Sequence, residues 1–124
     1  MRLLLDTHAV LWFLADDARL GDEARRRLDD VDNRVLLSAV VVWEIAVKRS
    51  LGKLEVTAGY LPLLLGGGAE ALPISIDHSA AVELLPWRHR DPFDRMLVAQ
   101  AQVEDATIVS GDPALAAYGV PVVW

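Results

Sequence analysis

Arg2-Leu3-Leu4-Leu5-Asp6-Thr7-His8 is the stretch of sequence that decides the fold. A run of leucines that ends abruptly at an aspartate is typical of a strand buried on both faces. The same pattern returns at Arg34-Val35-Leu36-Leu37-Ser38. Between the two runs, Val10, Leu11 and Leu14 have helical spacing. Strands of this kind separated by a helix predict a parallel sheet, because parallel strands need a crossover connection.

The rest of the chain continues this alternation. Further strands are predicted at 72–76, 107–110 and 120–123. Helices are predicted at 7–15, from Gly21-Asp22 onward, at 39–51, once within 52–68, from Asp77 or Ser79 to Pro86, from Asp91-Pro92 to about Glu104, and after Asp112-Pro113. In the segment 39–51, three consecutive valines favour a strand, but its length, the Glu44/Lys48 spacing and Ser38 as N-cap favour a helix. We therefore expect one α/β domain over residues 1–124, with a parallel sheet covered on both faces.

The composition excludes several classes of protein. The chain has 124 residues, of which 53% are apolar and 24% charged, as expected of one folded domain. It has no cysteine, which excludes disulfides, thiolate zinc sites and cysteine nucleophiles. The longest uncharged stretch, 56–69, is shorter than the roughly 20 residues of a membrane span, and Asp6 and His8 interrupt the N-terminal leucines before a signal peptide could form. We expect a soluble, cytoplasmic protein with no membrane partner.

The charge of the chain directs attention to its acids. The formal net charge is −6 and the pI is about 4.9, which argues against simple binding to a phosphate backbone. Ligands of parallel sheets bind beyond the carboxyl ends of the strands. Asp6 ends the first strand, Glu44 lies two turns into the helix after the second, Asp94 opens the helix before the fourth, and Asp112 lies just past the fourth.

Helix capping is the alternative explanation for most of these acids. Asp6, Asp91 and Asp112 each stand where an N-cap is expected, and two of them precede a proline. Glu44 is different, because it interrupts a nearly continuous apolar segment; its alternative is an ion pair with Lys48 one turn later. If the acids converge, a hard divalent cation would remove their repulsion, since Mg²⁺ and Mn²⁺ prefer oxygen ligands. Such a site suits phosphoryl chemistry.

Four fragments of the sequence resemble one family. They are Leu3-Leu4-Leu5-Asp6-Thr7-His8, the stretch from Ser38-Ala39 to Trp43-Glu44-Ile45, Asp91-Pro92-Phe93-Asp94-Arg95-Met96-Leu97-Val98-Ala99-Gln100-Ala101, and Ser110-Gly111-Asp112. Together they resemble the PIN-domain nucleases, and most of all the VapC-like toxins of toxin–antitoxin pairs. The resemblance implies a three-layer α/β/α sandwich with a central parallel sheet of four to five strands. It also implies an endoribonuclease that uses Mg²⁺ or Mn²⁺, leaves a 5′-phosphate, and is inhibited by a VapB-like antitoxin.

The resemblance also assigns roles to residues. It implies a catalytic set of Asp6, Glu44, Asp94 and Asp112, with Ser110 supporting the pocket and Asp91 remaining a cap. We expect Asp6, Asp94 and Asp112 to hold the metal ion, directly or through water, and Glu44 to orient the attacking water. His8 is expected to pack or hydrogen-bond rather than to bind metal.

Substrate and partners require other residues. Contacts to RNA phosphates are expected from Arg88, Arg90 and Arg95, with His89, Lys48, Arg49 and Lys53 as further candidates; the alternative is that these are ordinary surface charges. Trp12, Phe13 and Leu14 are either core residues or a groove for an antitoxin helix. Trp43 and Trp87 are open to the same two interpretations, and one of them is a candidate for the interface of the expected homodimer.

Three other functions are compatible with parts of the pattern. A catalytically inactive PIN-like binding module would use the acids only as helix caps. A phosphohydrolase with an aspartyl nucleophile would place its nucleophile at Asp6, but here the residue two positions later is His8 rather than an aspartate. A phospho-receiver domain needs a lysine late in the sheet, whereas Lys48 and Lys53 are the only lysines. The first of these is the main alternative to the nuclease.

Overall fold

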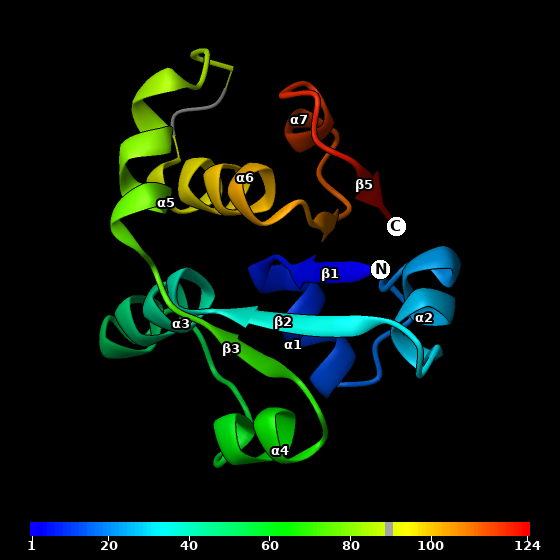
Figure 1. Ribbon diagram of the computed structural model, residues 1–124. Helices are drawn as coiled ribbons and strands as arrows, with labels where there is room; N and C mark the ends of the chain where they lie inside the picture. Colours follow the sequence, from blue (N-terminus) through cyan, green and yellow to red (C-terminus); the bar gives the residue numbers. More distant parts are fainter. Residues whose placement is uncertain (89–90) are drawn as a thin grey trace.

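Five parallel strands form a single sheet in the order β3-β2-β1-β4-β5 in the computed structural model, which describes residues 1–88 and 91–124 (Figure 1). The strands are β1 (Arg2–Leu5), β2 (Arg34–Ser38), β3 (Glu70–Leu72), β4 (Thr107–Val109) and β5 (Val122–Val123). The helices are α1 (Thr7–Leu14), α2 (Asp22–Asp29), α3 (Ala39–Ser50), α4 (Tyr60–Gly66), α5 (Ile76–Ala81), the 3₁₀ turn η1 (Val82–Leu84), α6 (Pro92–Glu104) and α7 (Pro113–Ala116). The predicted α/β fold with a parallel sheet is confirmed.

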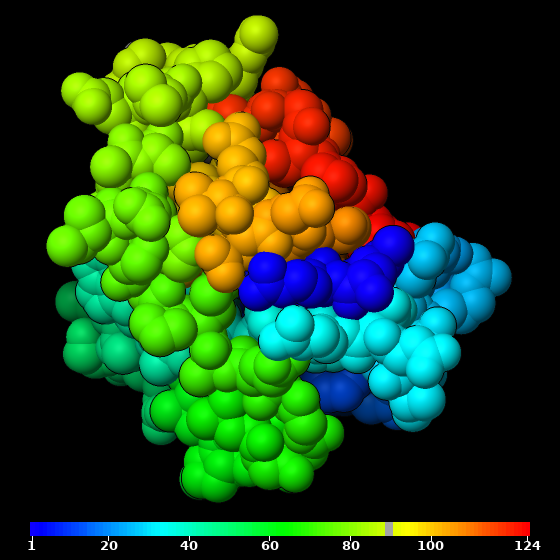
Figure 2. Space-filling view, in the orientation of Figure 1, coloured from blue at the N-terminus to red at the C-terminus, as the bar shows by residue number. Residues whose placement is uncertain are grey.

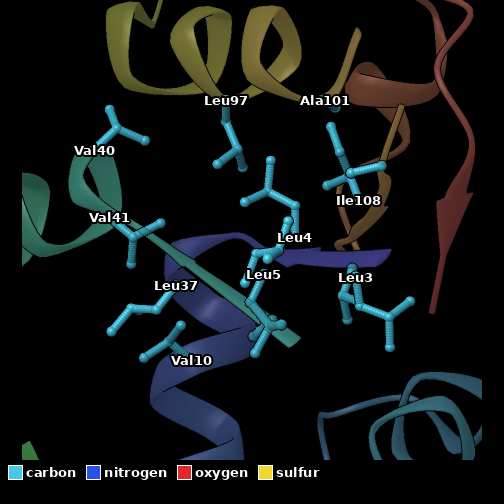
Figure 3. Packing of buried hydrophobic residues seen from close by; sticks show 14 of the residues in the cluster. Leu3, Leu4, Leu5, Val10, Leu37, Val40, Val41, Leu97, Ala101 and Ile108 are labelled. Carbon is cyan, nitrogen blue, oxygen red and sulfur yellow. The ribbon is translucent and has the colours of Figure 1, made fainter. Parts of the chain in front are cut away.

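The central strand β1 is buried on both faces. Leu3 and Leu4 are fully buried, and Leu4 pairs in register with Leu36 of β2 and Ile108 of β4. Figure 3 shows Leu97 of α6 approaching β1 from one side and Val10 of α1 from the other. The space-filling view shows the β1 segment between α6 and β2 (Figure 2). Because helices cover both faces, β1 reads as an unbroken apolar run rather than an alternating one.

The helix starts follow the capping residues in the sequence. The Ser38 hydroxyl accepts the N–H of Val40, so the three valines that follow form the first turn of α3 rather than a strand. Asp91 accepts the N–H groups of Phe93 and Asp94, and Pro92 occupies the first position of α6. The predicted helices at 39–51 and 92–104 are confirmed.

The third strand differs from the prediction. It was expected at 72–76 but covers Glu70–Leu72, because Pro73 has no N–H to donate and the Ser75 hydroxyl then caps α5 through the N–H of His78. The polar Glu70 is accepted here because β3 is an edge strand. Its carboxylate pairs with Arg34 of β2 at 2.8 Å. The helix expected from Asp77 or Ser79 begins earlier, at Ile76.

Over the described parts of the chain, none of the helices has the length and apolar character that crossing a membrane requires.

Candidate active site

Asp6 and Asp112 lie together where β1 and β4 end. The Asp6 N–H donates to the carbonyl of Val109 at 3.1 Å, which fixes the end of β1 beside the end of β4. The Ser110 hydroxyl accepts the N–H of Asp112 at 3.0 Å and also interacts with the Asp6 carboxylate. Ser110 is 2% exposed and Asp6 is 8% exposed. One buried hydroxyl therefore connects the Asp6 carboxylate to the backbone of Asp112.

The Asp6 carboxyl is in an unusual environment. Burial raises its pKa above the ordinary value, and the negative charge of Asp112 acts in the same direction. The Ser110 hydroxyl, the N–H of Ala9 and the positive charge of His8 oppose this shift. The Ala9 N–H lies 2.8 Å from Asp6 Oδ1, so Asp6 also caps α1. A cation bound beside this carboxyl would favour its ionised form and so lower its pKa.

Glu44 is held by two neighbours. It is 8% exposed, its Oε1 accepts the Thr7 hydroxyl at 2.6 Å, and its Oε2 accepts the Lys48 ammonium at 2.6 Å. Thr7 directly follows Asp6, so two consecutive residues contact the acids that follow β4 and β2. Asp6 faces Ser110 and Asp112, and Thr7 binds Glu44.

The start of α6 brings Asp94 to the same region. The pKa of Lys48 is raised mainly by its hydrogen bond to Glu44, and the charges of Asp91 and Asp94 add to this effect. The residues before Glu44 and Asp94 in the sequence, Trp43 and Phe93, pack edge to face with ring centroids 4.8 Å apart. This aromatic contact joins α3 to α6 beside the two acids.

The site is divided into two groups rather than one cage. Across residues 1–88 and 91–124, no three His, Asp or Glu side chains are close enough to hold a metal ion between them. The expected set of Asp6, Asp94 and Asp112 is therefore not a ready-made three-carboxylate site. Asp6 and Asp112 still provide two oxygen-donor side chains, and Mg²⁺ is commonly held by one or two carboxylates with waters completing its shell. The donor chemistry fits a hydrated hard cation.

Arg95 does not face the acids as expected. It is 4% exposed, and its guanidinium donates to the carbonyls of Pro86 at 2.9 Å, Val82 at 3.2 Å and Leu85 at 3.3 Å. The prediction that Arg95 contacts RNA is wrong in this structure, because a residue from the polar first turn of α6 is turned into the protein to anchor the preceding loop. Arg88 is exposed, as a phosphate contact requires. Arg90 and His89 lie outside the described residues.

Two functional candidates were missed or undervalued in the sequence. Thr7 gave no signal beyond its place after Asp6. Lys48 was considered as a surface partner of Glu44 or as a contact to RNA phosphates, whereas its charge acts among Glu44, Asp91 and Asp94. The i, i+4 spacing was the available signal, but spacing alone does not show that the glutamate is buried.

Comparison with known proteins identifies the family. The family model described as PIN domain matches residues 3–121. A curated relative, ribonuclease VapC16 of Mycobacterium tuberculosis, is 42% identical over 69 residues, which are 53% of this chain and 47% of that protein. The chain thus spans about half the length of this relative.

Solved structures agree on the fold. VapBC2 from Rickettsia felis, bound to a DNA fragment from its promoter, matches with a TM-score of 0.75 at 16% identity, over 99% of this chain and 98% of that chain. DNA-bound VapBC from Salmonella typhimurium matches with a TM-score of 0.71 at 14% identity, over 99% and 97%. VapC20 from Mycobacterium tuberculosis, described as a sarcin-ricin loop cleaving toxin, matches with a TM-score of 0.68 at 18% identity, over 95% of each chain.

Proposed function

From the premise that this chain belongs to the PIN-domain family, we propose that it is a divalent-metal-dependent endoribonuclease, a VapC-like toxin that a VapB-like antitoxin inhibits. The observation that carries the proposal is the pair of consecutive residues Asp6 and Thr7. Through these two residues, acids that follow three parallel strands lie near the carboxyl ends of the strands: Asp6 lies beside Asp112, and Glu44 accepts the Thr7 hydroxyl. The 42% identity with a ribonuclease supports the same conclusion.

The residues divide the chemistry between them. Asp6 and Asp112 would hold Mg²⁺ or Mn²⁺, with Asp94 joining through water. When bound, the cation supplies an activated water and neutralises negative charge on the scissile phosphate. Glu44 would orient a water for attack in line with the leaving oxygen. Ser110 fixes the Asp6 carboxylate, and Thr7 fixes that of Glu44. The products would carry a 5′-phosphate and a 3′-hydroxyl.

Cleavage of RNA tests this proposal. Total RNA is incubated with the wild type in Mn²⁺, in Mg²⁺ and in EDTA, and the ends of the fragments are sequenced. Asp6→Asn should abolish cleavage while keeping the fold, because asparagine also caps helices well. Asp22→Asn, in the first turn of α2 and exposed, is the matched control and should cleave like the wild type. Undiminished cleavage by Asp6→Asn, or in EDTA, rejects the assignment.

The inactive binding module remains the second candidate, because one observation favours it. The side chains of Asp6, Asp91 and Asp112 all accept N–H groups as helix caps, so each has a structural role without metal. The two candidates differ in their response to Mn²⁺. A metal-binding site stabilises the folded state on adding millimolar Mn²⁺, whereas a set of caps leaves the melting temperature unchanged.

The proposed antitoxin site is a hollow between α1, the end of α2 and α4. It has a volume of about 540 Å³ and is lined by Phe13, Leu14, Leu28, Val31, Leu63 and Leu64, with Asp29 and Asp30 among the lining residues. Phe13 is 41%, Leu63 60% and Val31 95% exposed. Trp12 is not part of it, because its ring packs against Trp124. An amphipathic helix that carries a basic residue fits this apolar, acid-rimmed surface.

Co-purification tests the antitoxin site. The chain is co-expressed with the product of a small reading frame adjoining its gene, and Leu63→Glu should abolish the complex. Val103→Glu is the matched control, because Val103 is a 43% exposed valine on α6, away from the hollow. Retention of the complex by Leu63→Glu contradicts this location.

The proposed homodimer uses a second hollow, between α3, α4 and β3. Its volume is about 460 Å³ and its lining includes Val42, Trp43, Ala46, Leu65 and Leu72. An apolar surface of this kind on one helix face suits a two-fold interface, in which each copy presents the same patch. Sedimentation equilibrium should show a dimer for the wild type and a monomer for Leu65→Glu; a dimer in both contradicts the proposed face.

A further inference from the structure

Three aromatic rings form a continuous cluster near the Asp6 end of α1. The His8 imidazole stacks on Trp12, with ring centroids 5.2 Å apart and an interplanar angle of 15°. Trp124, the last residue, packs edge-on against Trp12 at 5.6 Å. The Arg19 guanidinium lies over the same Trp12 ring, 4.8 Å from its centroid. We refer to His8, Trp12 and Trp124 as the aromatic platform.

The platform adjoins the acids of the site from two directions. His8 lies two residues after Asp6, close enough for its charge to act on the Asp6 carboxylate. Trp124 packs on Gly111, the residue between Ser110 and Asp112: a Cβ on Gly111 would lie 2.8 Å from Trp124 Cε2. The loop that carries Asp112 and the first turn of α1 therefore meet on these rings.

Core packing explains only part of the platform. Trp12 and Trp124 are partly buried, and both belong to the apolar residues packed against the core. His8 is exposed, yet its ring lies nearly parallel to Trp12. An exposed imidazole held in this orientation is pre-organised to receive a flat ring, because the orientation costs no further side-chain entropy on binding.

We propose that His8 is the outer layer of a nucleobase subsite, on which one base of single-stranded RNA stacks while the neighbouring phosphate lies at the cation that Asp6 and Asp112 would hold. This inference rests on the proposed nuclease function and adds a base-binding residue to it. Single-stranded RNA presents unstacked bases, and histidine and tryptophan are among the side chains that stack on them. Stacking tolerates any base, so the subsite positions the substrate without selecting a sequence.

Oligonucleotide binding in Mn²⁺ tests the subsite, and every protein, the wild-type reference included, carries Glu44→Gln so that the oligonucleotide is not cut while Asp6 and Asp112 can still hold the cation. Fluorescence anisotropy measures the affinity of labelled single-stranded oligoadenylate, and of an oligomer of equal length made of abasic ribose phosphates. His8→Ala should weaken oligoadenylate binding about fivefold or more, whereas His8→Phe should bind like the wild type because it restores a flat ring. The abasic oligomer should bind all three proteins equally. Ile76→Ala is the control: Ile76 is 87% exposed at the start of α5, outside the site and both hollows, and the affinity of this variant should be unchanged.

The outcomes separate the subsite from the nuclease. Equal affinity of the wild type and His8→Ala for oligoadenylate, including no measurable binding by either, overturns the subsite. So does an equal loss on the abasic oligomer, or a failure of His8→Phe to restore binding, since each points to charge rather than stacking. RNA cleavage by the wild type in Mn²⁺ is measured alongside. If the wild type cleaves RNA but His8→Ala binds oligoadenylate normally, only the subsite is rejected. If His8→Ala loses affinity but the wild type does not cleave RNA, only the nuclease function is rejected.

Discussion

The Lys48 ammonium lies 2.6 Å from Glu44 Oε2, on a carboxylate whose other oxygen accepts the Thr7 hydroxyl at 2.6 Å. The charges of Asp91 and Asp94 also act on this ammonium. Lys48 thus supplies the positive charge for the Glu44 half of the site from within the chain. Its side chain is 43% exposed, whereas that of Glu44 is 10% exposed, so the lysine is the partner that water can replace.

Lys48→Met should lower the free energy of unfolding by about 1 kcal/mol in EDTA, because a buried carboxylate loses a charged partner. Added Mn²⁺ should recover more stability in this variant than in the wild type, since a cation can take over the lost role. Urea denaturation with and without Mn²⁺ measures both effects. The double variant Glu44→Gln/Lys48→Met should be more stable than Lys48→Met alone, because glutamine leaves no buried charge. A double variant no more stable than the single one would show that the loss in Lys48→Met does not come from an unpaired Glu44 carboxylate.

The acids could be located from sequence because each stands at a marked position. Asp6 and Asp112 follow apolar strands, and strand order places their carboxyl ends together. The helix at 39–51 was decided correctly by Ser38, a local signal. Long-range contacts were not accessible in this way. Nothing local shows that Thr7 binds Glu44, and no pattern shows that the acids form two groups rather than one cage.

Arg95 shows why residue type alone misled the sequence analysis. A basic side chain beside Asp94 suggested a phosphate contact. Consecutive residues of a helix point in different directions, however, so Asp94 and Arg95 have different surroundings in the first turn of α6. The guanidinium donates hydrogen bonds to three backbone carbonyls and lies over the Trp87 ring, 4.0 Å from its centroid. Contacts between RNA and the other predicted arginines stay predictions. Arg95 is buried by these contacts within the protein.

Arg95→Met should destabilise the protein by about 2–3 kcal/mol, because it leaves the buried Leu85 carbonyl without its donor and removes a charged second donor from the carbonyls of Val82 and Pro86. Arg88→Met, at an exposed position, should change stability by less than about 0.5 kcal/mol and weaken RNA binding instead. Thermal unfolding and RNA affinity are measured for both variants. If Arg95→Met unfolds like the wild type and loses RNA affinity, the contact to RNA predicted from sequence would be restored.

Glu104 stabilises the folded protein at neutral pH through two partners, and this stabilisation depends on pH. Its pKa is lowered mainly by the hydrogen bond from His78, and further by Arg2, whose guanidinium lies 3.2 Å away. The pKa of Glu104 in the folded state is below the ordinary value of 4.5. Its contribution to the free energy of unfolding is therefore complete above pH 4.5 and is lost as the pH falls through the lower, folded-state pKa. Glu104→Gln should therefore be less stable than the wild type at neutral pH, and the difference should shrink on acidification. Urea midpoints between pH 7 and 3 measure this, with exposed Glu55→Gln as control. A difference that is constant with pH would exclude this carboxylate as the source.

Gly111 ties the loop that carries Asp112 to the C-terminus. A Cβ at this position would lie 2.8 Å from Cε2 and 3.1 Å from Cζ2 of Trp124. Gly111→Ala should therefore cost about 1–3 kcal/mol of stability, as over-packing does. Gly66→Ala is the matched control, because a Cβ there meets nothing within 4 Å; it should be neutral or slightly stabilising. In Gly111→Ala/Trp124→Ala the added methyl meets no ring, so the double variant should lose less than the sum of the two single changes. Additive losses in urea denaturation would exclude the Trp124 ring as the source of the cost.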